Sequence, residues 1–233
     1  MHSRDQGNAS VLQPDRLERS ISLIFNIVVY ALLGVFFYQA AGTFSEYRPG
    51  QRWPLLLSFF RMWTFLPIHE AGHFMFKFFG RTLYILGGSF WQIALPLVWF
   101  LVALKKRSYI APFALFWVGE NFMDVSLYIR DAPFRWLPLL GGHASRHDWY
   151  NLLSDFDMLD SAETFANISY YAGATVCLGA IGAGLYLAAT SFLRPEPVVS
   201  PRLPDNSPPV SGLEVLLDES LESKKQKTPR ESS

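Results

Sequence analysis

The chain has 233 residues, of which 50% are hydrophobic and 17% charged, and its formal net charge at pH 7 is zero. With no excess of basic residues, we expect neither a nucleic-acid nor a nucleotide partner. The single cysteine, Cys177, excludes an internal disulfide and a metal site built from several thiolates. This composition favours a bundle of membrane helices over a single soluble domain.

Five apolar runs predict an all-α fold, a polytopic membrane helix bundle over residues 21–193. Each run has about the 20 residues that a helix needs to cross a bilayer. The third run contains Gly87, Gly88 and Pro96. It therefore either spans the membrane or enters it and returns, because irregular backbone at membrane depth is tolerated beside a cavity. The runs cover residues 21–42, 55–79, 83–104, 109–129 and 168–193.

Polar segments flank and interrupt this helical domain. Residues 1–20 have mixed charge and no apolar period, so we expect a flexible N-terminus. The connection 132–166 mixes aromatic residues, leucines and acids, and we expect it to lie at the membrane surface. Residues 194–233 are rich in proline and serine and predict a disordered tail. The expected location is the plasma membrane, which in a bacterium is the inner membrane.

The second run contains His69-Glu70-Ala71-Gly72-His73, a His-Glu-x-x-His pattern. Helical residues four apart share a face, so both histidines can bind one metal ion. Glu70 lies one position further round, where its carboxylate can reach a metal-bound water. Pro67 predicts a kink beside the motif, since it removes the helical partner of the Trp63 carbonyl. Ionisable groups are costly in hydrocarbon, so the pattern indicates a Zn²⁺ site rather than a polar patch.

A catalytic zinc site needs a third protein ligand and an open position for water. Asp124 is the preferred candidate, because one carboxylate and two neutral histidines leave a charge of +1 that Glu70 would balance. Glu120 and Asn121 share its helical face. Asp124 could instead form only a helix-packing hydrogen bond, for example to Arg61. The other candidates for the third ligand are Glu120, Asp131, His147 and Asp148.

Gln92, with Gly87 and Gly88, is the candidate for substrate binding. A membrane-spanning substrate is helical and must be unwound, so a protease needs an edge or loop that pairs with extended backbone. The segment from Gly87 to Gln92 is the candidate for that edge. Gln92 could also orient a metal ligand or form a plain interhelical hydrogen bond.

Two further patterns concern helix placement. His147-Asp148-Trp149 is similar to an ordered acid–base pair, but in an aromatic-rich connection we interpret it as a helix start with Asp148 as the N-cap. In the last apolar run, small residues recur on one helical face, which predicts close packing against another helix. This face consists of Gly173, Cys177, Ala180, Gly184 and Ala188.

These residues resemble the site-2 protease family of intramembrane zinc metallopeptidases, particularly its small members built mainly on the membrane core. The resemblance covers about residues 55–131. It rests on His69-Glu70-x-x-His73 in a spanning segment, on Gly87-Gly88 with Gln92, and on a later membrane aspartate. In that family such an aspartate completes the zinc site, which implies Asp124 here. Val125 follows Asp124, where the family commonly has glycine.

The sequence thus predicts a zinc metalloendopeptidase that hydrolyses peptide bonds of membrane proteins or peptides within or near the lipid bilayer. Glu70 would act as the general base. The main alternative is a non-catalytic metal-binding membrane protein or an inactive protease relative, which would bind zinc without needing Glu70. Transport of metal or protons is a third possibility, but the paired repeats common in transporters are missing from the sequence.

Overall fold

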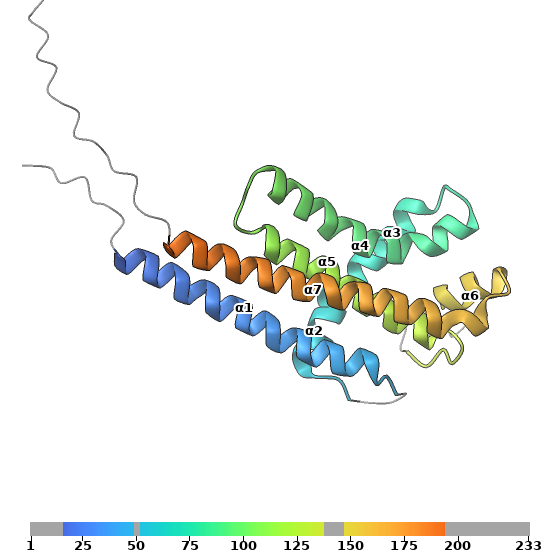
Figure 1. The fold of residues 1–233 in the computed structure, drawn as a ribbon. Coiled ribbons are helices and arrows are strands. Elements are labelled where there is room, and N and C mark those ends of the chain that lie inside the picture. Colours follow the sequence, from blue (N-terminus) through green and yellow to red (C-terminus); the bar gives the residue numbers. More distant parts are fainter. Residues whose placement is uncertain (1–15, 49–51, 138–146, 194–233) are drawn as a thin grey trace, which may run out of the picture. The chain divides into compact units, whose positions relative to one another are not determined.

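The computed structural model describes residues 16–48, 52–137 and 147–193, which contain helices and turns but no strand. The predicted all-α fold is therefore confirmed for this part of the chain. Most of the predicted N-terminal segment and all of the predicted tail lie outside it, while residues 16–20 begin the first helix. The elements are α1 (Arg16–Ser45), α2 (Leu55–Phe60), the π-helical turn η1 (Arg61–Phe65), α3 (Leu66–Phe76), α4 (Arg81–Lys105), α5 (Ala111–Asp131), α6 (Asp148–Asp155), the 3₁₀ turn η3 (Leu159–Ser161) and α7 (Ala162–Leu193) (Figure 1).

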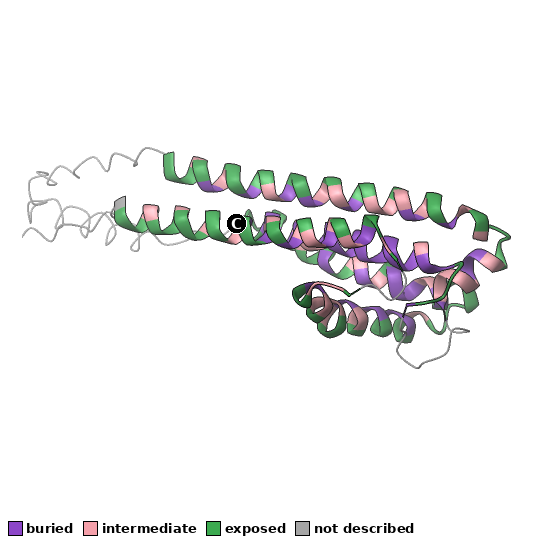
Figure 2. Ribbon diagram, turned by 90° about the horizontal axis from the view of Figure 1, so that it is seen from below, coloured by how far each residue is buried: buried purple, intermediate pink, exposed green. Residues whose placement is uncertain are grey.

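Among the described residues, three helical segments are long and apolar enough to cross a membrane: Leu17–Ser45, Arg81–Lys105 and Leu159–Leu193. In the first and last, only 17% of the most apolar window is buried. Their outer surfaces instead expose large apolar side chains, and Figure 2 shows the long helices largely green. Exposed apolar area on this scale suits lipid rather than water. The long apolar helices and their exposed apolar surfaces are those of a membrane protein.

The remaining predicted spans are helical, but they are not simple lipid-facing helices. Residues 55–76 are divided into α2, η1 and α3. Most residues of α5 are buried, including the acidic side chains of Glu120, Asp124 and Asp131. That these two segments cross the bilayer stays a prediction. The third run forms the single helix α4, which continues through Gly87, Gly88 and Pro96 without a re-entrant turn.

Helix α5 is the centre of the bundle and packs most extensively against α7, which in turn packs against α1 (Figure 1). The predicted small-residue face of α7 makes these contacts, and all five of its members are buried. A Cβ added at Gly173 would meet Gly119 and Met123 of α5, and one added at Gly184 would meet the ring of Tyr30 of α1. Small side chains therefore allow the close helix approach that the pattern predicted.

The π-helical turn η1 lies directly before the helix that carries the His-Glu-x-x-His pattern. The Leu66 N–H donates to the carbonyl of Arg61, five residues earlier, which widens this turn. Pro67 is the second residue of α3, which continues from η1 with helical backbone, and it has no N–H to donate to the preceding turn. A π turn thus precedes the motif, and such turns are frequent at functional sites, while the kink expected at Pro67 stays a prediction.

Candidate metal centre

Three potential metal ligands converge at the contact of α3 and α6. His69 and His73 lie on one face of α3, and their Nε2 atoms are 3.1 Å apart. Asp148 Oδ2, from the first residue of α6, is 3.0 Å from His69 Nε2 and 3.1 Å from His73 Nε2. Ligands around a tetrahedral zinc ion are about 3.3 Å apart, as follows from metal–nitrogen bonds of about 2.0 Å. These side chains need to open by only a few tenths of an ångström to hold zinc.

The hydrogen bonds behind the two histidines determine which ring nitrogens face one another. His73 Nδ1 is 2.8 Å from the Tyr84 carbonyl oxygen, which only accepts, so Nδ1 carries the proton. Gln92 Nε2 donates to the Asp124 carboxylate at 2.8 Å, which leaves Gln92 Oε1 to accept from His69 Nδ1 at 3.1 Å. In the neutral rings both Nε2 atoms therefore present lone pairs toward Asp148. One proton would satisfy a single pair of these atoms, whereas a divalent cation satisfies all three.

Asp148 is held in this position by a buried network. The Asp148 N–H donates to Tyr128 Oη at 3.1 Å, and the Tyr128 hydroxyl donates to Asp148 Oδ2 at 3.2 Å. His147 Nδ1 accepts the Tyr150 N–H at 3.1 Å, so His147 and not Asp148 is the N-cap of α6. His147 Nε2 donates to Asp131 Oδ2 at 3.2 Å. The prediction of a helix start at this motif is confirmed, and the predicted cap residue is corrected.

The electrostatics of Asp148 favour its ionised form. Burial alone would raise its pKa, but when His69 and His73 carry protons on Nε2 their hydrogen bonds and positive charge outweigh burial and lower the pKa to about 2. The carboxylate is therefore ready to act as an anionic ligand near neutral pH. Together, two neutral imidazoles and one carboxylate are a donor set that suits zinc.

Asp124, the ligand preferred from the sequence, lies outside this group of three residues. Its Oδ1 accepts from Arg61 Nη1 at 2.7 Å and its Oδ2 accepts from Gln92 at 2.8 Å. The helix-packing bond to Arg61, left open as the alternative, is thus present. Asp124 acts on His69 through Gln92, and this chain of hydrogen bonds fixes the tautomer and orientation of a candidate metal ligand. The structure therefore moves the candidate third ligand from α5 to α6.

The other candidates for the third ligand have different partners. Asp131 accepts from the backbone N–H groups of Trp136 and Leu137 as well as from His147. Glu120 is fully buried, and its Oε1 accepts a weak hydrogen bond from Cys177 Sγ at 3.9 Å. Neither acid belongs to the group formed by His69, His73 and Asp148.

His69, His73 and Asp148, called the metal group below, line one cavity of about 550 Å³ together with Glu70. Its other lining residues include Arg61, Gln92, Asp124 and Tyr128. The Glu70 side chain is exposed to this space, while His69 and His73 are only 5% and 8% exposed. Glu70 is therefore the more accessible of the acidic and histidine side chains of the His-Glu-x-x-His pattern.

Gly87 and Gly88 do not form an edge that could pair with a substrate. Both are buried within α4, and they allow α3 and α4 to approach closely. A Cβ added at Gly88 would lie 2.5 Å from His69 Nε2 and 2.7 Å from His73 Nε2. The two imidazoles therefore lie directly against the backbone of α4, and Gly88 shapes the metal group rather than a substrate groove.

Replacing Gly88 with Ala should displace both imidazoles and lower zinc affinity on the order of 10- to 100-fold, the range typical of disturbed ligand orientation. Chelator competition on detergent-purified protein measures this change. Gly182→Ala is the control, because no atom lies within 4 Å of a Cβ added at Gly182. Equal zinc affinity in the two variants would contradict the described packing.

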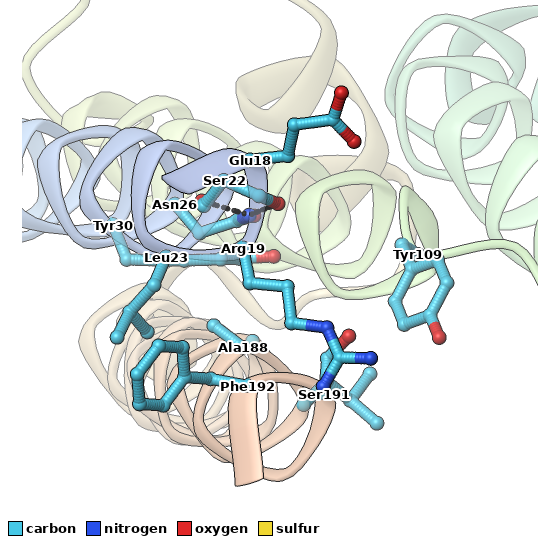
Figure 3. Close-up of a pocket in the computed structure, with 12 residues that line it drawn as sticks. Glu18, Arg19, Ser22, Leu23, Asn26, Tyr30, Tyr109, Ala188, Ser191 and Phe192 are labelled. Atoms are coloured by element: carbon cyan, nitrogen blue, oxygen red, sulfur yellow. Dashed lines mark hydrogen bonds between the residues drawn. The ribbon is translucent and has the colours of Figure 1, made fainter. Parts of the chain in front are cut away.

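A second cavity, of about 320 Å³, lies between α1 and α7 and is lined by polar and apolar side chains. Figure 3 shows Ser22, Asn26 and Arg19 on its α1 side and Ser191 and Phe192 on its α7 side. The Asn26 amide donates to the Ser22 carbonyl at 2.8 Å, within α1 itself. Neither helix contributes a ligand to the metal group, so this cavity is separate from the candidate centre.

The metal group includes one residue that the sequence did not favour as the third ligand. Asp148 is one of the alternative third ligands, and the structure places its carboxylate beside both histidines at the start of α6. Tyr128, which binds Asp148, carried no recognisable signal in the sequence. Comparisons of the chain with protein-family models, with curated proteins and with solved structures found no match.

Proposed function

We propose that the protein is a membrane-embedded zinc peptidase in which His69, His73 and Asp148 hold the metal. The convergence of two Nε2 lone pairs and one carboxylate oxygen beside an accessible cavity carries this proposal. With three protein ligands the site keeps a position open, as catalytic zinc sites do, whereas structural zinc sites use four. The resemblance to site-2 proteases supports the same reaction, with the third ligand supplied by α6.

When bound, zinc would lower the pKa of a coordinated water to about 7 and polarise the scissile carbonyl. The Glu70 carboxylate accepts the proton of the attacking water and transfers it to the leaving amine. Gln92 holds the His69 ring, and Asp124 in turn holds Gln92. Tyr128 fixes the Asp148 carboxylate. The substrates are peptide bonds of membrane proteins or peptides that reach the cavity from the bilayer.

Zinc analysis and a cleavage assay on the same preparation test this proposal. Detergent-purified protein should contain about one zinc ion per chain, and His69→Ala should contain almost none. Removal of zinc with a chelator should abolish cleavage of a co-reconstituted single-span protein, and added zinc should restore it. Zinc-loaded wild-type protein that cleaves none of a panel of single-span substrates would favour the non-catalytic alternative.

A further inference from the structure

Arg61 has two hydrogen-bond donors that the contacts described so far do not use. Its side chain is 12% exposed and lines the cavity of the metal group, called the metal cavity below. Nη1 donates to Asp124 Oδ1 at 2.7 Å, and the guanidinium carbon lies 4.8 Å from the centroid of the Trp53 ring. No described residue accepts from Nε or Nη2, and neither of these atoms is buried. Arg61 is therefore held by one nitrogen and by its face, while the edge formed by Nε and Nη2 is open.

The second arginine that lines the metal cavity, Arg81, has no such open edge. Its Nε donates to Asp155 Oδ2 at 2.9 Å, and its Nη2 donates to Asp155 Oδ1 at 3.2 Å. The two nitrogens that are open in Arg61 are therefore occupied in Arg81. This contrast makes Arg61 the better donor to a molecule that enters the cavity, and it makes Arg81 a matched control.

The π turn η1 brings Arg61 to the helical face that carries the two histidines. Arg61 is the first residue of η1, and helical backbone continues from there into α3. In a regular α-helix Arg61 and His69, eight residues apart, would differ by about 80° around the axis. A π turn, closed by i→i+5 hydrogen bonds, takes almost one residue more than the roughly 3.6 residues of an α turn. The eight residues therefore complete about two turns, or roughly 11 Å along the axis.

The charge around Arg61 favours a neutral acceptor. Asp124 already neutralises the guanidinium, so a second carboxylate at the open edge would be repelled by Asp124. A backbone carbonyl is neutral, and an unwound substrate segment at membrane depth needs donors for its carbonyl groups. Gly87 and Gly88 cannot provide a pairing edge for that segment, because both are packed against α3.

We propose that Arg61 Nε and Nη2 donate to a backbone carbonyl of the substrate polypeptide, about three residues from the scissile bond. The register follows from the separation of Arg61 and His69 along the helix, because an extended peptide advances about 3.3 Å per residue. This inference rests on the proposed function, which it deepens by naming the group that binds the unwound substrate backbone.

Peptide binding to zinc-free protein tests this contact without requiring turnover. The probe is a fluorescein-labelled hexapeptide amide of alternating leucine and serine, and fluorescence anisotropy measures its binding to detergent-purified protein. Each backbone amide is replaced in turn by an ester, which removes the N–H alone, and by an (E)-alkene, which removes both the N–H and the carbonyl. At one position the alkene should bind about 10- to 100-fold more weakly than the ester, the range expected for a hydrogen bond from a charged donor.

Protein variants assign the alkene–ester difference to Arg61. Asp124→Asn should retain the difference, and the double variant Asp124→Asn/Arg61→Met should lose it, a comparison that leaves no carboxylate unpaired. Arg81→Met is the control and should retain the difference, because the Arg81 donors are occupied. Should the double variant fail to fold, Arg61→Lys decides. It keeps a positive charge beside Asp124 but lacks the edge of two donors, so most of the difference should disappear.

Equal binding of alkene and ester at every position of the wild-type complex would overturn the proposal. A difference that persists undiminished in the Arg61 variants would also overturn it. The same peptide with a free C-terminal carboxylate tests the other kind of acceptor. If this acid binds more tightly than the amide, and the double variant loses that preference, Arg61 binds a carboxylate instead and the proposal is wrong.

Failure of the proposed function is distinguishable from failure of this contact. An Arg61-dependent alkene–ester difference in a protein whose purified wild type contains no zinc would support the contact and contradict the peptidase. Zinc-dependent cleavage with no alkene–ester difference would support the peptidase and contradict the contact.

Discussion

Asp148→Asn should remove stoichiometric zinc from the purified protein, whereas Asp124→Asn should retain zinc with an affinity lower by about 10- to 100-fold. The difference follows from position. Asp148 Oδ2 is within 3.1 Å of both histidine Nε2 atoms, while Asp124 reaches His69 only through Gln92. An amide in place of the Asp148 carboxylate removes the anionic ligand. The same change at Asp124 removes a charge but keeps one hydrogen-bonding oxygen.

Zinc content at fixed free zinc, followed by chelator competition, measures both effects. Asp155→Asn is the matched control, because Asp155 lies on the same helix as Asp148 and pairs with Arg81 at 2.9 Å on the surface. Its zinc content should equal that of the wild type. Full zinc occupancy in Asp148→Asn together with loss of zinc in Asp124→Asn would return the third ligand to α5.

Glu70→Gln should keep zinc and lower turnover by a factor of about a hundred to ten thousand, the usual contribution of a general base. Glutamine preserves the shape of the side chain but cannot accept the proton of the attacking water. The side chain is exposed to the metal cavity and is not one of the three converging ligands, so metal binding does not depend on it directly. Loss of its negative charge near the cation is expected to weaken zinc binding only modestly.

Zinc occupancy and cleavage of a single-span reporter must therefore be measured on the same preparation. Glu70→Asp is an informative companion, since it keeps the carboxylate and moves it back by one methylene group. Partial activity in Glu70→Asp with little in Glu70→Gln would support a proton-transfer role. Undiminished cleavage by zinc-loaded Glu70→Gln would rule out this mechanism.

The helical fold and two of the candidate ligands could be predicted from the sequence because their signals are local. Apolar runs of about 20 residues predict helices wherever lipid or a bundle core must be filled. The four-residue spacing of His69 and His73 places both rings on one side of α3 as soon as a helix forms. The small-residue face of α7 likewise predicts close packing without identifying the partner, which proved to be α5 and α1.

The tertiary structure alone decided the third candidate ligand and the roles of the supporting residues. Asp124 and Asp148 are both acidic residues that a helical bundle could bring to the two histidines. Neither the local sequence pattern nor the charge count shows which of them lies there. The separation depends on the buried contacts of His147 with Asp131 and of Tyr128 with Asp148, which bring the start of α6 against the histidines. Likewise, the role of the glycines of α4 depends on how closely α3 approaches. Only the packing of the two helices shows that a Cβ at Gly88 would meet both imidazoles.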